Sequence, residues 1–248
     1  MSAMQPAWVL GRKNYGDNGL LVEFLTAEAG RCGVIARGVF RRKTGGSLAS
    51  ILQPFHPLLI RLAGRGELKT LAAAESPTPA YVLKGDHLLS GLYLNELLTR
   101  LLPRFDPHSA VFLSYGDAVE SLHDACGEIA LRRFELILLT ELGYRIEWRA
   151  DVNQDAIKES VEYLYEPGQG FIPGAYLQAG VHKKTWVSGA GIRVVSDWLQ
   201  GGVSPQKSEL RMVKEVTRAA IAQLTQGRAL NSRDIFKSLR GSPTPQSD

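Results

Sequence analysis

The residues of this chain best suited to bind a ligand form a short run of fixed positive charge in segment 37–47, which also holds one aromatic ring. The run comprises Arg37, Phe40, Arg41, Arg42 and Lys43. Lys and Arg neutralise phosphate groups and release counterions, and an aromatic ring stacks on an unpaired base. Strand-like apolar runs flank the segment, and its glycines are typical of a loop. It indicates a surface for a polyanion, although a solvated surface loop would have the same composition.

Other cations of the first third are expected to extend this surface. Gly64 and Gly66 predict a tight turn around Arg65, from which Arg65 and Lys69 would reach further phosphates. The rest of the expected nucleic-acid-binding set is Arg12, Lys13 and Arg31.

Charge is distributed unevenly along the 248 residues. The whole chain carries a net charge of +4, whereas residues 1–78 hold ten Lys and Arg against five Asp and Glu. All the excess positive charge therefore belongs to the first third. This asymmetry indicates a nucleic-acid-binding part joined to a part with another task.

Five strand-like runs precede residue 78, each short, apolar and bounded by Gly, Asn, Asp or Pro. They are Trp8–Lys13, Gly19–Thr26, Arg31–Gly38, Ile51–Ala63 and Glu67–Ala74. Five strands without a long helix favour a small β-barrel of the OB-fold kind. The prolines of segment 76–79 predict a linker after it.

Helical periodicity dominates after the linker. We expect helices at 88–102, Ser109–Leu122, Glu128–Leu142, Ile192–Leu199, Pro205–Thr225 and Arg233–Leu239. Short pieces between about 144 and 189 predict a small hairpin or irregular insertion. The expected class is α+β: an OB-fold domain at 1–78, a helical domain at 79–240 containing that insertion, and a disordered tail at 241–248.

No arrangement of residues predicts catalysis. The five histidines never occur at the spacing of a helical metal site, and Gly33 and Gly38 have P-loop spacing without the Lys that holds phosphate. Cys32 and Cys126 are too few for a zinc site or a disulfide framework, and both are expected to be small core residues. Without a membrane-length apolar run or a signal peptide, we expect a cytoplasmic, nucleoid-associated protein that is not an enzyme and has no cofactor.

An ordered set of motifs resembles the RecO family of bacterial recombination mediators. The set includes residues 15–21, Gly30-Arg31, residues 36–38, 52–55, 64–71, 90–98, 131–135, 142–144 and 230–236. The resemblance implies an OB-fold followed by a helical domain and binding of single- and double-stranded DNA. It also implies annealing of complementary strands, and partnership with RecR, RecA and the acidic tail of single-stranded-DNA-binding protein.

The chain departs from many family members in its insertion. Those members carry a four-cysteine zinc site there, whereas residues 145–186 contain no Cys. We therefore expect no metal, and an insertion held by apolar packing among Trp148, Tyr163, Tyr165 and Phe171.

A site for the acidic tail is expected on the helical domain. A terminal carboxylate needs an Arg and a terminal aromatic needs an apolar groove. The expected residues are Leu113, Val119, Leu122, Arg132 and Arg133. The alternative is that Phe134 lies in the hydrophobic core and that Arg132 and Arg133 are exposed to solvent. Two rival classes remain open: an OB-fold nucleic-acid-binding module without a mediator role, and an enzyme built on the helices.

Overall fold

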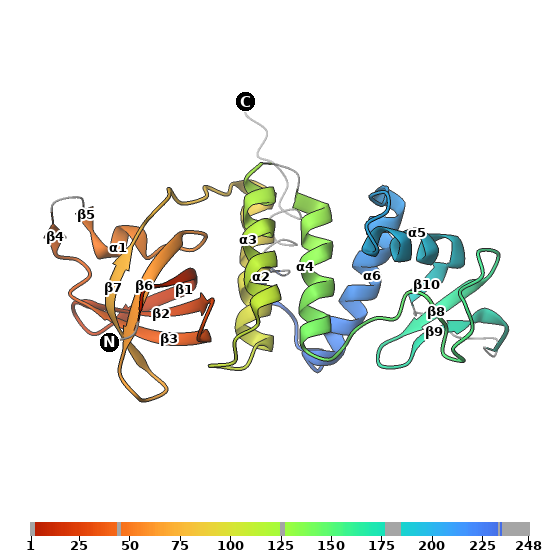
Figure 1. The fold of residues 1–248 in the computed structure, drawn as a ribbon, viewed down its shortest axis with the longest axis horizontal. Coiled ribbons are helices and arrows are strands. Elements are labelled where there is room, and N and C mark those ends of the chain that lie inside the picture. The colour runs from red at the N-terminus through yellow and green to blue at the C-terminus, as the bar shows by residue number, and fades with distance from the viewer. Residues whose placement is uncertain (1–2, 44–45, 125–126, 177–184, 233, 235–248) are drawn as a thin grey trace, which may run out of the picture. The chain divides into compact units, whose positions relative to one another are not determined.

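The first part of the chain folds as a closed five-stranded barrel (Figure 1). The computed structural model describes residues 3–43, 46–124, 127–176, 185–232 and 234. The barrel strands are β1 (Gln5–Tyr15), β2 (Gly19–Thr26), β3 (Gly30–Arg37), β6 (Pro57–Ala63) and β7 (Lys69–Glu75). They close in the order β1-β2-β3-β7-β6, with β3 and β7 parallel and the other pairs antiparallel. This confirms the α+β class with an N-terminal OB-fold barrel.

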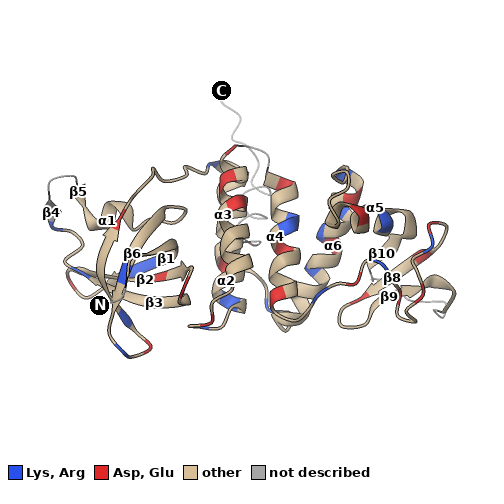
Figure 2. Ribbon diagram, in the orientation of Figure 1, with Lys and Arg blue, Asp and Glu red and all other residues tan. Residues whose placement is uncertain are grey.

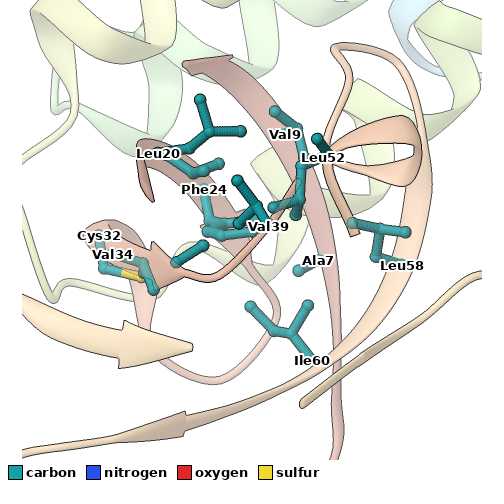
Figure 3. Packing of buried hydrophobic residues seen from close by; sticks show 13 residues of the cluster. Ala7, Val9, Leu20, Phe24, Cys32, Val34, Val39, Leu52, Leu58 and Ile60 are labelled. Carbon is teal, nitrogen blue, oxygen red and sulfur yellow. The ribbon is translucent and has the colours of Figure 1, made fainter. Parts of the chain in front are cut away.

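Alternate residues of the strands fill the barrel core. Leu20, Val22 and Phe24 of β2 point inward, opposite Cys32 and Val34 of β3 (Figure 3). This period of two is what a strand with one buried face requires. Burial raises the pKa of the Cys32 thiol to about 12, so this cysteine is a core residue as expected. Cys126 lies outside the described residues.

The strand expected over Ile51–Ala63 is wrong in its first half. A short helix, α1 (Leu48–Ile51), ends at the first residue of that run, and β6 begins only at Pro57. Phe55 has a φ of 64°, a left-handed conformation that interrupts a strand, and it stands between Pro54 and Pro57. The apolar content of the run hid a helix and a turn.

The basic run after β3 contains two short strands. β4 (Arg42–Lys43) pairs antiparallel with β5 (Gly46–Ser47). The expected loop therefore carries a small hairpin of its own.

Two compact units divide the chain. The first comprises residues 1–127 and 230–248, and the second residues 128–229. The expected boundary at residue 78 lies inside the first unit, where α2 (Gly85–Leu101) and α3 (Ser109–His123) follow the barrel. Asn95 of α2 donates to the Leu10 carbonyl of β1 at 2.8 Å and accepts from Tyr115 of α3 at 2.6 Å, which ties both helices to the barrel.

The second unit combines helices with a small sheet. Its helices are α4 (Gly127–Glu141), α5 (Gly189–Leu199) and α6 (Lys207–Leu224). Its strands β8 (Glu162–Glu166), β9 (Gly170–Pro173) and β10 (Thr185–Ser188) form a sheet in the order β10-β8-β9, followed after β9 by a short helical turn, η1 (Gly174–Tyr176).

Aromatic packing holds the insertion, as expected. Phe171 lies 5.2 Å from Trp148 and 5.3 Å from Tyr165 between ring centres, and all three are buried with Tyr163. Burial raises the pKa of Tyr165 to about 12.

The C-terminal expectations fall almost wholly outside the described residues. Of the helix expected at Arg233–Leu239, only residue 234 is described, and the tail at 241–248 is not. Among the described helices, none is long and apolar enough to span a membrane.

Candidate nucleic-acid interface

One end of the barrel gathers exposed cations and an aromatic ring from two adjacent loops. The backbone N–H groups of Gly38 and Val39 donate to the Asn18 carbonyl at 2.8 and 3.3 Å, which joins the loop after β3 to the β1–β2 turn. Four predicted residues are exposed here: Lys13, Arg37, Phe40 and Arg41. We call this group the basic end of the barrel. Figure 2 shows Lys and Arg on the strands and loops of this domain.

Arg12 has a structural contact at the same end. It pairs with Val22, whose side chain is in the core, and its Nη1 donates to the Ala49 carbonyl at 2.8 Å. Arg12 therefore positions α1, although it remains exposed. The side chains of Arg42 and Lys43 lie outside the described part of the structure, so their role as phosphate contacts stays a prediction.

Arg31 is engaged inside the first unit. Its Nη1 lies 2.6 Å from Glu23 Oε1, and its Nε donates to the Leu102 carbonyl at 2.9 Å. Glu23 also pairs with Arg104 at 3.0 Å. The side chain of Arg31 is only 15% exposed. A buried, paired guanidinium is poorly placed to neutralise a phosphate, so the structure favours a structural role for Arg31.

Gly30 permits the chain segment after α2 to approach β3. It has a φ of 65°, and a Cβ at this position would overlap the backbone of Asp106. The Phe105 N–H donates to the Arg31 carbonyl at 2.9 Å, and Arg104 forms a parallel bridge with Arg31. Segment 102–108 therefore covers the start of β3.

The other two predicted cations lie at the opposite end of the barrel. The β6–β7 turn carries the exposed Arg65 and, in Figure 1, lies at the end away from β4 and β5. Lys69 Nζ lies 5.2 Å from the Phe105 ring centre and donates to the Gly64 carbonyl at 3.3 Å. The expected contact set is thus divided between two ends, and Lys69 makes an internal cation–π contact.

Two residues on the outer face of the barrel were absent from the predicted nucleic-acid-binding set. Arg104 reaches the outer face of β3 from a segment distant in sequence, and no local pattern marks it. Tyr15 is 44% exposed beside the β1–β2 turn. Its alternation with Lys13 along β1 was a usable signal, because residues two apart on a strand share a face.

The residues expected to hold an acidic tail differ widely in exposure. On α3, Leu113 is 67% exposed whereas Val119 and Leu122 are buried. On α4, Arg132 is only 4% exposed and its Nη1 lies 2.7 Å from Glu135 Oε2. The sequence suggested an exposed Arg132, either in a groove that binds the tail or in solvent. The structure instead shows a buried Arg132.

Arg133 also has an internal partner. Its guanidinium carbon lies 5.3 Å from the Trp198 ring centre, in a cation–π contact within the second unit. Phe134 is fully buried.

A cationic cluster surrounds Arg132. Burial lowers the pKa of Lys214, and the positive charges of Arg218 and Arg132 lower it further, whereas Glu128 and Glu135 oppose this. Arg132 Nε is buried without a hydrogen-bond partner among the described residues. A buried donor without a partner costs about 1–3 kcal/mol, so a hydrogen-bond acceptor that reached Arg132 Nε would be stabilising.

Metal ligands are not gathered in the described part of the chain, where no three His, Cys, Asp or Glu side chains lie close enough to hold an ion.

Comparison with known proteins agrees with this architecture. The family model described as the recombination protein O N-terminal domain matches residues 1–79, and that of the C-terminal domain matches residues 83–234. A DNA repair protein RecO from Halorhodospira halophila is 40% identical over 238 residues, which is 95% of this chain and 97% of the relative. Those of Enterobacter sp. strain 638 and Escherichia coli O139:H28 are 35% and 36% identical over 240 residues, covering 96% of this chain and 97% and 95% of the relatives.

Proposed function

The chain belongs to the RecO family of DNA repair proteins, and on this premise we propose that it is a recombination mediator that binds single- and double-stranded DNA. It anneals complementary strands and, with RecR, helps load RecA onto DNA coated by single-stranded-DNA-binding protein. This takes place in the cytoplasm, at the nucleoid. The observation that carries the proposal is the basic end of the barrel, where Lys13, Arg37, Phe40 and Arg41 are exposed.

Electrostatics supports annealing without an energy source. Two single strands repel each other through their phosphates, and each Lys or Arg contact neutralises a phosphate and releases counterions. A protein surface that lowers this repulsion allows base pairing itself to drive annealing. We accordingly propose a non-enzymatic role, with the barrel of residues 1–78 as the DNA-binding domain and residues 79–240 as the domain that meets partners.

A coated strand must also be reached, and we propose that the helical domain binds the acidic tail of the coating protein. The buried Nε of Arg132, which has no partner among the described residues, and the lowered pKa of Lys214 support a carboxylate at this cluster. A charge-assisted hydrogen bond to the tail would satisfy Arg132 Nε. The contribution of Arg133, and of Leu113, Val119 and Leu122, rests on the family resemblance.

The second candidate is a nucleic-acid-binding module with no mediator role. Both candidates use the basic end of the barrel, but only the mediator gives the Arg132 cluster a ligand.

A strand-annealing assay separates the two candidates. Complementary labelled strands are mixed with the protein, either bare or coated with single-stranded-DNA-binding protein. We expect faster annealing in both cases. Faster annealing of bare strands alone would support the second candidate, a nucleic-acid-binding module without a mediator role. Faster annealing of neither bare nor coated strands would contradict the proposal.

A further inference from the structure

The outer face of β1, β2 and β3 is covered over one half of its length. The Trp8 ring of β1 packs against Tyr115 of α3 and Tyr81, with ring centres 5.5 and 6.0 Å apart. Segment 102–108 covers the start of β3 through Arg104 and Phe105. A nucleic-acid strand cannot use this half of the face.

The end of this face that lies away from Trp8 carries a row of residues across the three strands. Tyr15 pairs with Gly19 of β2, and Gly19 pairs with Arg37 of β3. Lys13 lies two residues before Tyr15 and so points to the same face. Tyr15, Arg37 and Lys13 are all exposed. This part of the face therefore carries one aromatic ring and two cations.

Gly19 shapes the surface beside the ring. A Cβ on Gly19 would lie 2.7 Å from the Tyr15 carbonyl oxygen and 3.7 Å from Cδ1 of the Tyr15 ring. A larger residue would therefore force the backbone apart and crowd the ring. Glycine leaves the strand surface flat on that side of Tyr15.

The Tyr15 side chain has no bonding partner in the described part of the chain. It makes no hydrogen bond and no ring contact with a described residue, unlike Tyr115, whose hydroxyl donates to Asn95 at 2.6 Å. A large aromatic side chain that is left 44% exposed beside two cations has the chemistry of a stacking platform for single strands.

We propose that Tyr15 stacks on an unpaired base of single-stranded DNA, while Lys13 and Arg37 contact the adjoining phosphates. The inference rests on the proposed function and names the form of DNA that this part of the barrel recognises. Bases within a duplex are already stacked on their neighbours, so Tyr15 contributes to single-strand affinity and not to duplex affinity. Asp17 is the one carboxylate in segment 12–22 and repels phosphate at the tip of the turn, so the strand passes over Tyr15 and Arg37 instead.

The test compares Tyr15→Ala and Tyr15→Phe with Tyr144→Ala. Tyr144 is a matched control because it is also 44% exposed but lies in the second unit. Fluorescence anisotropy gives the affinity of each variant for a labelled single strand and for the same sequence as a duplex. Melting curves check that each variant is folded.

Stacking on one base changes affinity by roughly 5- to 100-fold. We expect Tyr15→Ala to lose that much single-strand affinity, with duplex affinity and the salt dependence of binding unchanged. Tyr15→Phe and Tyr144→Ala should match the wild type. A single strand bearing 2-aminopurine should be quenched by the wild type and less by Tyr15→Ala.

Two results would overturn the inference. Wild-type single-strand affinity in Tyr15→Ala would remove the stacking role while leaving the proposed function intact. An equal loss for single strand and duplex would make Tyr15 a general support of the surface. Failure of the wild type to bind either DNA is distinguishable from both, because it would contradict the proposed function itself.

Discussion

The Glu96 carboxylate binds Ser232 across 136 residues of sequence. Glu96 Oε2 accepts from the Ser232 backbone N–H at 2.8 Å and from its hydroxyl at 2.7 Å, and Oε1 accepts from the Asn231 N–H at 2.8 Å. Arg100 pairs with the same carboxylate at 2.7 Å. This contact explains why residues 230–232 belong to the compact unit of the barrel and not to the unit that precedes them in sequence.

Replacing Glu96 by Gln should loosen this contact in a pH-dependent way. Burial alone would raise the pKa of Glu96, but hydrogen bonds from Ser232 and Asn231 and the charge of Arg100 lower it below the ordinary value of 4.5. A lowered pKa means that the folded state favours the charged carboxylate. The stabilisation is therefore complete above the ordinary pKa and is lost as the pH falls through the folded-state pKa.

We expect Glu96→Gln to cost about 1–3 kcal/mol in the free energy of unfolding at neutral pH. The difference from wild type should narrow as the pH falls below the ordinary pKa of 4.5 and through the lowered folded-state pKa. Urea denaturation, monitored by circular dichroism, measures the free energy of unfolding of each variant. Glu67→Gln serves as the control because Glu67 is exposed. A difference that stays constant with pH would show that charge at Glu96 does not matter.

Arg31 and Arg37 should separate stability from DNA binding. Both lie on β3, but among the described residues only Arg31 has an ion-pair partner, Glu23 at 2.6 Å. Arg31→Ala leaves Glu23 without this partner and should lower the free energy of unfolding by about 1–3 kcal/mol. Arg37→Ala should instead change stability by less than about 0.5 kcal/mol and reduce the salt slope of DNA binding by about 0.7–0.9. A reversed pattern would place Arg31 on the DNA and Arg37 in the fold.

The protein should fold and bind DNA without zinc. The insertion has no Cys in residues 145–186, and Trp148, Tyr165 and Phe171 pack together there. Metal analysis of the purified protein should find no stoichiometric zinc, and a chelator should leave the melting temperature unchanged. One tightly bound equivalent would contradict this expectation.

Arg132→Ala should weaken binding of the acidic tail. Loss of a charge-assisted hydrogen bond of about 1.5–3 kcal/mol corresponds to roughly ten- to a hundredfold in affinity. The same change leaves Glu135 buried without Arg132, at a cost of about 3–5 kcal/mol in stability. Arg132→Lys is therefore tested as well, because it keeps the charge near Glu135 and loses the guanidinium Nε.

Fluorescence anisotropy of a labelled tail peptide gives the affinities. We expect weaker binding by both Arg132 variants and unchanged binding by Arg211→Ala, which removes an exposed cation of α6. Annealing of bare strands should be normal in Arg132→Lys. Wild-type peptide affinity in Arg132→Lys would mean that the tail binds elsewhere.

Local pattern predicted the barrel better than it predicted the site. β2 was expected with its observed bounds because it is a short apolar run between turn residues, and Leu20, Val22 and Phe24 of this run fill the barrel core. The strand predicted for the first half of the Ile51–Ala63 run is wrong because apolar content alone does not distinguish a buried helix or turn from a strand.

The contacts of the candidate site residues could not be predicted, for a different reason. Arg31 and Arg37 are equivalent in local sequence pattern, and the contacts of Arg31 with Glu23 and with segment 102–108 make them different. Arg132 is likewise defined by Glu135 together with Thr217 of α6, whose hydroxyl donates to that carboxylate at 2.6 Å. Tertiary contacts of this kind leave no signal in the neighbouring residues, whereas the clustering of charge in residues 37–43 does.

The salt dependence of DNA binding tests most directly whether the basic end of the barrel is the DNA site. The variant Arg41→Ala/Arg42→Ala/Lys43→Ala is compared with wild type and with Arg65→Ala, which removes a cation from the opposite end. Each lost phosphate contact should reduce the slope of log affinity against log salt by about 0.7–0.9, so the triple variant should lose roughly two to three units. Stability should change little, because Arg41 is exposed and surface substitutions usually fall within about 0.5 kcal/mol. A triple variant with the wild-type slope, or a larger loss in Arg65→Ala, would contradict the assignment of DNA to this end of the barrel.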